Sequence, residues 1–266
     1  MTNSSGTSTT APATARPLTG RTAVVTGATS GIGAATAVRL AADGASVALL
    51  GRREERLKEL ADRLRPTATG EILPVPVDLT DSAAVGGAAR AVRASLGPAD
   101  LVVANAGAML GAPFESADTG EWDRMIDVNL RGLLHTARAF TDDLLTAAAG
   151  DRPADLVTVG SVAGHQLYPG WSAYCATKAA VAHLVRNLRA EFGPRGVRVR
   201  NVEPGVTVTE LGDDMRDAGM RESLAGMRTG ITPLAAEDIA DAVAYSVAAP
   251  RHVNIAELVV VPVQQG

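Results

Sequence analysis

The amino-acid sequence predicts an α/β protein whose doubly wound, mostly parallel sheet has seven strands and helices on both faces. From Thr22 onward, short apolar runs alternate with longer segments of helical period, which is the pattern of repeated βαβ units. Aromatic residues make up only 3% of the chain and hydrophobic residues 46%, so small aliphatic side chains must fill the core. The length of 266 residues suits a single α/β domain, which commonly has about 250.

Seven short apolar runs are strand candidates because turn residues bound them. They are Thr22 to Thr26, Ser46 to Leu50, Ile72 to Val77, Leu101 to Ala104, Leu156 to Gly160, Val197 to Val202 and Leu258 to Val261. Pro74 and Pro76 lie in the third run, and proline has no N–H group to donate to a neighbouring strand. We therefore expect this strand at an edge of the sheet.

Six segments with helical period lie between these runs. They are Gly33 to Asp43, Glu54 to Arg65, Ser82 to Ser95, Glu121 to Ala147, Ser172 to Phe192 and Glu237 to Ala248. The segment Val206 to Thr232 interrupts the alternation, because it is long, contains four glycines and directly follows a strand. Long loops in compact domains usually serve as lids or binding segments. We expect a substrate lid over about residues 206–232.

Residues 1–17 differ in composition from the rest of the chain. They contain mostly Ser, Thr, Ala and Pro with a single charged side chain, Arg16, so they offer little apolar surface to offset the entropy of ordering. We expect a disordered tail here and one domain over residues 18–266. A transit peptide is the alternative, although it would need several arginines and an amphipathic pattern.

Charge, cysteine content and hydropathy narrow the classes of partner. The chain has 25 Lys and Arg against 29 Asp and Glu, and its net charge of −4 offers no general attraction for nucleic acid. Cys175 is the only cysteine, and no Cys/His cluster has the spacing of a metal site. No apolar run approaches the roughly 18 residues needed to span a bilayer, and signal-peptide features are missing. These observations predict a cytoplasmic protein with no nucleic-acid, membrane or metal partner.

Three glycines join the first predicted strand to the first helix. Backbone N–H groups and the helix dipole at such a turn can receive a pyrophosphate. Gly27, Gly31 and Gly33 are spaced four and then two residues apart, unlike the two-then-three spacing of the usual dinucleotide fingerprint. A tight turn without a ligand is the alternative explanation.

The end of the second predicted strand indicates which nicotinamide cofactor would bind. An acidic residue there binds the ribose 2′-hydroxyl of NAD, whereas an arginine accommodates the 2′-phosphate of NADP. This chain has Gly51 in place of the acid, followed by Arg52 and Arg53, whose planar guanidinium groups hold phosphate through paired hydrogen bonds. The stretch therefore predicts NADP(H). Alternatively, the two arginines merely open a charged, solvated helix.

Two polar residues on one predicted helix have the spacing of a catalytic pair. Tyr174 and Lys178 are four residues apart, so they share a helix face. The ammonium group would favour the phenolate and lower the phenol pKa from its usual value of about 10. An ordinary surface pair is the alternative.

Ser161 follows a predicted strand at the sheet edge where ligands bind, although a lone serine is more often a turn or cap residue.

Taken in order, these motifs resemble those of the short-chain dehydrogenase/reductase (SDR) family, whose glycine motif is T-G-x-x-x-G-x-G. The segment Asn105-Ala106-Gly107 matches the family's N-A-G motif, and Pro204-Gly205 matches the turn after its sixth strand. The family's catalytic tetrad is matched by Asn129, Ser161, Tyr174 and Lys178. The resemblance covers about Leu18 to Gln265. It implies a Rossmann-type fold and assembly as a homodimer or homotetramer.

The resemblance also implies roles for the matching residues. Tyr174 would donate a proton to a substrate carbonyl oxygen, and Ser161 would hydrogen-bond that oxygen. Lys178 would lower the Tyr174 pKa and hold the nicotinamide ribose, while Asn129 would hold a water in a proton relay. The residues expected to bind NADP(H) are Gly27, Thr29, Ser30, Gly31, Ile32, Gly33, Arg52, Arg53, Asp78, Leu79, Asn105, Ala106, Gly107, Tyr174, Lys178, Pro204, Gly205, Val206, Thr207 and Thr209.

Side chains between Ser161 and Tyr174 are expected to reach a substrate. Tyr168 and Trp171 stand out in a chain with few aromatic residues, although packing or a subunit contact would explain them equally well. The predicted substrate pocket also includes His165 and, from the lid, Met215. Surface exposure of the histidine and gap filling by the methionine are the alternatives.

The C-terminal residues Glu257, Pro262 and Gln265 resemble a bacterial SDR subgroup that includes clavulanate dehydrogenase and NADP-dependent 3-hydroxy-acid dehydrogenases. That subgroup often has Arg-Pro-Thr where this chain has Val261-Pro262-Val263. The implied function is reversible, NADP(H)-dependent reduction of a small-molecule ketone or aldehyde, such as an intermediate of secondary metabolism, to an alcohol. Alternatives are an NADPH-binding sensor without turnover, and an imine reductase, epimerase or dehydratase on the same scaffold.

Overall fold

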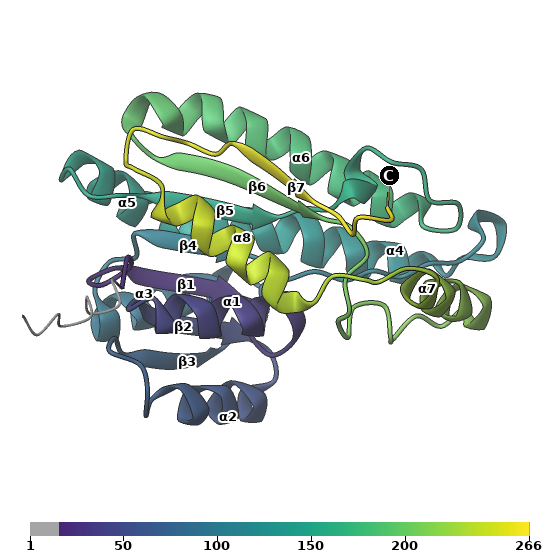
Figure 1. Cartoon of the computed structure of the whole chain (residues 1–266), viewed down its shortest axis with the longest axis horizontal. Helices are drawn as coiled ribbons and strands as arrows, with labels where there is room; N and C mark the ends of the chain where they lie inside the picture. The colour runs from purple at the N-terminus through teal and green to yellow at the C-terminus, as the bar shows by residue number, and fades with distance from the viewer. Residues whose placement is uncertain (1–15, 266) are drawn as a thin grey trace, which may run out of the picture.

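The predicted α/β fold is confirmed by the computed structural model, which describes residues 16–265. Its seven strands form one parallel, Rossmann-type sheet with the order β3-β2-β1-β4-β5-β6-β7 (Figure 1). The strands are β1 (Thr22–Thr26), β2 (Ser46–Gly51), β3 (Ile72–Pro76), β4 (Leu101–Ala104), β5 (Asp155–Val159), β6 (Arg198–Pro204) and β7 (Glu257–Val260). The chain reverses its direction across the sheet between β1 and β4, and such a reversal opens a ligand crevice beyond the carboxyl ends of the strands.

Each face of the sheet is covered by its own set of helices. The helices are α1 (Gly31–Ala42), α2 (Glu54–Leu64), α3 (Ser82–Leu96), α4 (Thr119–Ile126), α5 (Gly132–Ala149), α6 (Ser172–Phe192), α7 (Ala218–Gly230) and α8 (Ala236–Ala248). One buried cluster joins the sheet to α3, α5 and α6, and another joins it to α1, α2 and α8. Val24 packs in the first cluster and Val25 in the second, because successive side chains of a strand point to opposite faces.

The edge position expected for the third strand is confirmed. Strand β3 stands at the end of the sheet and pairs with β2. Pro74 lies opposite Leu49, and Pro76 lies opposite Gly51. The two prolines therefore lie in a strand with a neighbour on one side only, where a missing N–H group leaves no second ladder incomplete.

Three arginines surround one buried carboxylate at the amino ends of the central strands. Asp155 is fully buried and accepts hydrogen bonds from Arg21 at 2.8 Å and from Arg198 at 2.8 and 2.9 Å. Arg200 donates to the same carboxylate, and Arg21 also bonds Asp100 at 2.7 Å. This network lies at the opposite end of the strands from the crevice, so it stabilises the sheet without lining a ligand site.

One predicted helix is interrupted in the structure. The segment Glu121 to Ala147 consists of α4 and α5, which are joined by the π-helical turn Asp127–Arg131. This turn contains Asn129, and π-helical turns inside α-helices often occur at functional sites. The interruption was not predictable from hydrophobic period, because the apolar positions continue through it.

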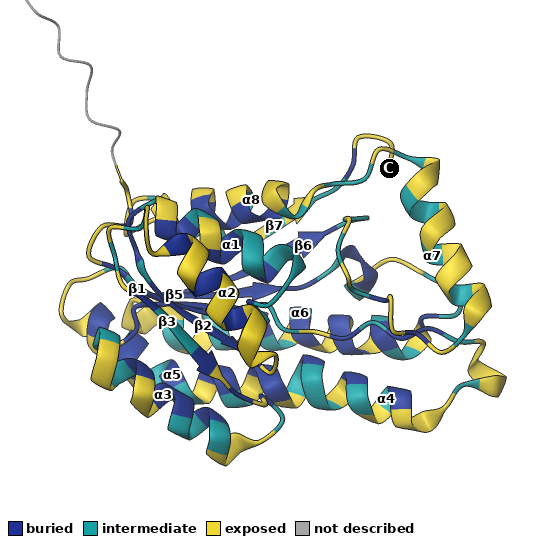
Figure 2. Ribbon diagram, turned by 90° about the horizontal axis from the view of Figure 1, so that it is seen from below, coloured by how far each residue is buried: buried dark blue, intermediate teal, exposed yellow. Residues whose placement is uncertain are grey.

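The segment expected to be a glycine-rich loop contains helix α7. Its first turn is capped by Asp217, whose side chain accepts a hydrogen bond from the Met220 N–H group at 2.8 Å. The helix has no buried residue and stands apart from the sheet (Figure 2). Its glycines concealed it in the sequence, because each costs a helix about 1 kcal/mol relative to alanine.

The expected disordered tail lies outside the described residues except for Arg16 and Pro17. Within residues 16–265, no helix is both long enough and apolar enough to cross a membrane. The same part of the chain contains no group of three or more His, Cys, Asp or Glu side chains able to hold a metal ion.

Candidate active site

A cavity of about 610 Å³ lies beyond the carboxyl ends of the strands, in the crevice that the sheet topology predicts. Segments that follow β1 to β6 line it, together with α6 and α7. Every residue predicted to bind the cofactor lines this cavity except Gly33. Residues scattered over the whole sequence are therefore gathered in one place.

The glycine turn fits closely against the loop after β4. Gly27 and Gly31 have positive φ angles of 65° and 50°, which other residues rarely adopt. Asn105 fixes the neighbouring loop, because its Nδ2 donates to the Thr26 carbonyl oxygen at 3.0 Å and its N–H donates to the Thr26 hydroxyl at 3.0 Å. The turn and this loop therefore form one rigid wall of the cavity.

Gly33 supports this wall instead of lining the cavity. A Cβ atom added there would lie 2.3 Å from the Gly27 carbonyl oxygen and 2.5 Å from the Asn105 side chain. The expectation that Gly33 contacts the cofactor stays a prediction, and in this structure the glycine lies behind the cavity wall. The glycine is needed because helix α1 approaches the turn too closely for any side chain.

Arginines gather at the end of β2. Arg52 is exposed, lines the cavity and has no hydrogen-bond partner among residues 16–265. Arg53 donates to the hydroxyls of Thr29 and Ser30, each at 2.7 Å, and to Glu210 of the lid at 2.8 Å. A cradle of glycine backbone beside guanidinium groups fits a pyrophosphate and an additional phosphate, so the residues present suit a dinucleotide of the NADP type.

Asp78 and Leu79 line the cavity after β3. The N–H and hydroxyl groups of Thr80 donate to Asp78 at 2.9 and 2.8 Å, and these hydrogen bonds hold the pKa of the Asp78 carboxyl below its usual range. Arg52 adds a weaker electrostatic effect in the same direction. The carboxylate is therefore fixed and ionised, as an acceptor for a ligand N–H or hydroxyl group must be.

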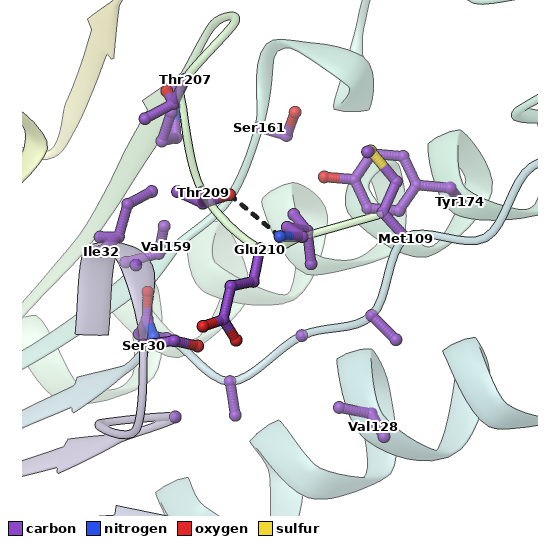
Figure 3. A pocket seen from close by; sticks show the side chains of 18 of the residues that line it. Ser30, Ile32, Met109, Val128, Val159, Ser161, Tyr174, Thr207, Thr209 and Glu210 are labelled. Carbon is purple, nitrogen blue, oxygen red and sulfur yellow. Dashed lines mark hydrogen bonds between the residues drawn. The ribbon is translucent and has the colours of Figure 1, made fainter. Parts of the chain in front are cut away.

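The predicted catalytic residues Ser161, Tyr174 and Lys178 lie at one end of the cavity. Figure 3 shows Ser161 and Tyr174 at this end and Ser30 of the glycine turn at the other. The Ser161 hydroxyl accepts a hydrogen bond from the Ala163 N–H group at 3.1 Å, which orients it where β5 ends. Ser161 therefore caps the short turn that follows β5, and the residue also lines the cavity.

Tyr174 and Lys178 are both buried, with 6% and 7% of their surface exposed. Burial raises the pKa of Tyr174 to about 12, although a hydrogen bond with Ser161 opposes the shift. Burial lowers the pKa of Lys178 to about 8. The sequence predicted a lowered tyrosine pKa, and the shift has the opposite sign because burial of the phenol outweighs its hydrogen bond with Ser161. Tyr174 therefore keeps its proton at neutral pH.

Asn129 is buried beneath this pair and lies outside the main cavity. Its Oδ1 accepts from the Ala108 N–H group at 2.8 Å, and its Nδ2 donates to the Thr177 hydroxyl at 2.9 Å. These bonds tie the loop after β4 to α6. A second cavity of about 10 Å³ borders both Asn129 and Lys178. That volume is at the lower limit for one water molecule.

The predicted substrate pocket is only partly as expected. Tyr168 and Trp171 line the cavity, whereas His165 and Met215 are not among its lining residues. His165 is exposed and lies 3.5 Å from Glu203, because the loop turns it away from the crevice. Met215 is 2% exposed and packs in a buried cluster behind the wall. These positions agree with the alternatives given above, surface exposure for His165 and gap filling for Met215.

Several lining residues were not anticipated from the sequence. Met109 after β4 and Leu224 of α7 add apolar surface, beside Met227 of the same helix. Glu210 adds a carboxylate that reaches the arginines after β2. The three-residue spacing of Leu224 and Met227 is that of one helix face and could have indicated a helix in the lid. The glycines around these residues obscured this signal.

Gln265, next to the last residue of the sequence, connects the lid to the substrate end of the cavity. Its Oε1 accepts from the Val206 N–H group at 2.8 Å, and its Nε2 donates to the Tyr168 hydroxyl at 3.1 Å. Gln264 binds the other end of the same segment, accepting from the Thr232 N–H group at 3.0 Å. The C-terminal segment therefore holds both ends of the lid.

Comparison with known proteins agrees with this geometry. A family model described as short chain dehydrogenase matches residues 21–219. The chain is 38% identical over 243 residues to sulfoacetaldehyde reductase 2 of Chromohalobacter salexigens, and the match covers 91% of this chain and 94% of that protein. It is 36% identical over 246 residues to glycine betaine reductase ATRR of Emericella nidulans, covering 92% of this chain but only 19% of that longer protein.

Solved structures give the same result. The closed form of a serine dehydrogenase complexed with NADP⁺ has a TM-score of 0.83 and 33% sequence identity, over 92% of this chain and 96% of that one. The family model spans most of the chain, and the reductase from Chromohalobacter matches along nearly its whole length. The chain therefore belongs to the short chain dehydrogenase family of oxidoreductases.

Proposed function

We propose that the protein is an NADP(H)-dependent oxidoreductase that reduces a ketone or aldehyde to an alcohol, and that it also catalyses the reverse reaction. The observation that carries the proposal is the buried pair of Tyr174 and Lys178 at one end of a cavity whose other end is the glycine turn. A proton donor and a dinucleotide cradle in one crevice are the two parts that carbonyl reduction needs.

Residues after β2 support NADP(H) as the cofactor. Gly51 leaves no acid for a ribose 2′-hydroxyl, and Arg52 faces the cavity as a donor for a 2′-phosphate. The similar serine dehydrogenase was solved with NADP⁺. The cradle would be formed by the glycine turn, Asn105 and the start of the lid.

The chain's own residues would perform the proton chemistry. When bound, the cofactor supplies or accepts the hydride at the carbonyl carbon. Tyr174 donates its hydroxyl proton to the carbonyl oxygen, and Ser161 hydrogen-bonds that oxygen while negative charge develops on it. Lys178 then stabilises the tyrosinate by its positive charge, and a water in the cavity beside Asn129 is the route by which the proton is replaced.

The substrate is proposed to be a small carbonyl compound, such as an intermediate of secondary metabolism. Trp171 and Tyr168 would flank it, with Met109, Leu224 and Met227 forming an adaptable apolar wall. One relative, matched along nearly its whole length, is named for the reduction of a small polar aldehyde, sulfoacetaldehyde. Sulfoacetaldehyde is therefore the first compound to test.

Association into a homodimer or homotetramer in the cytoplasm is part of the same proposal. Ala176, Ala179 and Ala180 are exposed along α6 and do not pack on the sheet. Small residues on an outward helix face allow a second helix to approach closely. Molar mass in solution tests this part, and a monomer at every concentration would contradict it.

Cofactor binding followed by turnover tests the function as a whole. The protein is titrated with NADPH and with NADH, and the absorbance of the reduced cofactor is then followed with a panel of aldehydes, ketones and cyclic imines. We expect tighter binding of NADPH and oxidation by at least one carbonyl compound. Binding without turnover over the panel would favour a sensor, and turnover with imines alone would contradict carbonyl reduction.

A further inference from the structure

A carboxylate of the lid is bound to the arginines of the proposed 2′-phosphate site. Glu210 accepts hydrogen bonds from Arg53 at 2.8 Å and from Arg56 at 2.7 and 2.9 Å. Figure 3 shows the Glu210 carboxylate inside the pocket, directed towards Ser30 of the glycine turn. The lid therefore reaches across the crevice to the place where the cofactors NAD and NADP differ.

The hydrogen-bonding capacity of Arg53 is largely used by these contacts. Its Nε and one terminal nitrogen donate to Thr29 and Ser30, and its other terminal nitrogen donates to Glu210. The hydrogen bond from Arg53, together with that from Arg56, holds the pKa of the Glu210 carboxyl below its usual range, so the group is a carboxylate at neutral pH. A phosphate approaching Arg53 must displace this carboxylate or lie beside it.

Arg52 is the remaining arginine at this corner that could bind a phosphate while Arg53 and Arg56 are bound to Glu210. It lines the cavity and has no partner in residues 16–265, so it is one available guanidinium among three at this corner. A 2′-phosphate carries about two negative charges at neutral pH, by analogy with other phosphate monoesters. The Glu210 carboxylate would repel this phosphate at a separation of a few ångströms. The repulsion weakens the binding of NADPH only, because NADH has no 2′-phosphate.

We propose that Glu210 is a specificity-determining residue, an internal competitor that occupies Arg53 and Arg56 and so weakens the binding of NADPH relative to NADH. This inference rests on the proposed function and adds to it a residue that limits the NADP preference. The ion pairs are half exposed, with 44% of Arg53 and 49% of Glu210 accessible, so the effect is moderate. Removing the charge should strengthen NADPH binding by about three- to tenfold.

The test compares dissociation constants for NADPH and NADH in wild type, Glu210→Gln and Glu222→Gln. Glu222 is an exposed acid on α7 with no ion pair to a described residue, so its variant carries the same charge change on the same lid. We expect about three- to tenfold tighter NADPH binding in Glu210→Gln alone, with NADH binding changed less than about twofold. The gain should shrink in about 1 M salt, where the Debye length falls to about 3 Å.

Two results would overturn the inference. If wild type prefers NADPH and Glu210→Gln binds it equally or more weakly, Glu210 fastens the lid over the phosphate and does not compete with it. If Glu222→Gln gives the same gain, the effect is the general charge of the lid. Failure of the proposed function differs from both results, because wild type would then bind neither cofactor or would prefer NADH by a wide margin.

Discussion

Lys178 Nζ lies 5.8 Å from the centre of the Tyr174 ring and donates a hydrogen bond to the Val159 carbonyl oxygen at 3.0 Å. The strand β5 therefore holds the lysine in place under the tyrosine. Both groups are buried, and burial disfavours the charged form of each, so their pKa values move apart, to about 12 for the tyrosine and about 8 for the lysine. A protonated phenol beside a cation suits proton donation to a carbonyl oxygen.

Lys178→Met should stabilise the fold at pH 7 while it removes activity. The folded lysine releases its proton at a pKa of about 8, against 10.5 in the unfolded chain, so burial of its charge costs stability below pH 8. Between these values the unfolded state binds more protons, and wild-type stability rises with pH. We expect Lys178→Met to be more stable by about 2 kcal/mol at pH 7, after loss of one hydrogen bond.

Urea unfolding of both proteins across pH 7 to pH 10.5 measures this difference. The advantage of the variant should decrease as the pH rises above about 8. A constant difference over this range would mean that Lys178 is not held with a lowered pKa.

Gly51→Asp combined with Arg52→Ala should change the cofactor preference towards NADH. The new carboxylate would accept a hydrogen bond from the ribose 2′-hydroxyl, and one phosphate partner would be lost. A Cβ at position 51 would lie 3.0 Å from Thr29 Cγ2, so the threonine must shift slightly. We expect the ratio of NADPH to NADH affinity to fall by about 100-fold, which corresponds to about 2.7 kcal/mol. An unchanged ratio in binding titrations would remove Arg52 from the phosphate site.

Gln265→Ala should affect the substrate more than the cofactor. The glutamine joins the start of the lid to the Tyr168 hydroxyl, so its loss frees one wall of the substrate end. We expect KM for the carbonyl substrate to rise about tenfold and NADPH affinity to change less than about twofold. Gln264→Ala is the matched control, because it contacts only the far end of the lid. Equal effects of the two variants would contradict a role at Tyr168.

Asp155→Asn should destabilise the sheet without changing the site. The asparagine keeps the shape but leaves Arg21, Arg198 and Arg200 without their shared anion in a buried place. Breaking a buried ion pair costs about 3 to 5 kcal/mol. Chemical unfolding measures the loss, and the affinity for NADPH at low temperature should be that of wild type. A loss below about 1 kcal/mol would mean that water reaches this network.

Much of the fold was predictable because its signals are local. Most strands are short apolar runs whose side chains pack on both faces of the sheet, and the prolines of β3 indicate an edge strand. The cavity lining by the glycine turn, Ser161, Tyr174 and Lys178 was predictable for the same reason, since each belongs to a short motif at a strand end or on one helix face. The SDR resemblance then ordered these motifs.

The remaining features depend on contacts between distant segments. Glu210 binds Arg53, and Gln265 binds Tyr168, across 157 and 97 residues of sequence. No local pattern encodes such pairs. The orientation of the His165 side chain was not predictable for a related reason. The path of a loop, and not its composition, decides which of its side chains face the crevice.

The sign of the Tyr174 pKa shift was also beyond the sequence. Spacing brings the lysine close, but the depth of burial decides how strongly desolvation raises the pKa of the phenol. In this protein 94% of the tyrosine surface is covered, since 6% is exposed, and desolvation dominates. A motif therefore predicts which side chains line the cavity more securely than it predicts their pKa values.

The most direct test of the central claim is the rate of NADPH oxidation by wild type and by Tyr174→Phe with the best carbonyl substrate of the panel. We expect the variant to bind NADPH with wild-type affinity and to lose activity by about 10²- to 10⁴-fold, because only the proton donor has been removed. Near-normal turnover in Tyr174→Phe would contradict the assignment of this tyrosine as the general acid, and with it the mechanism.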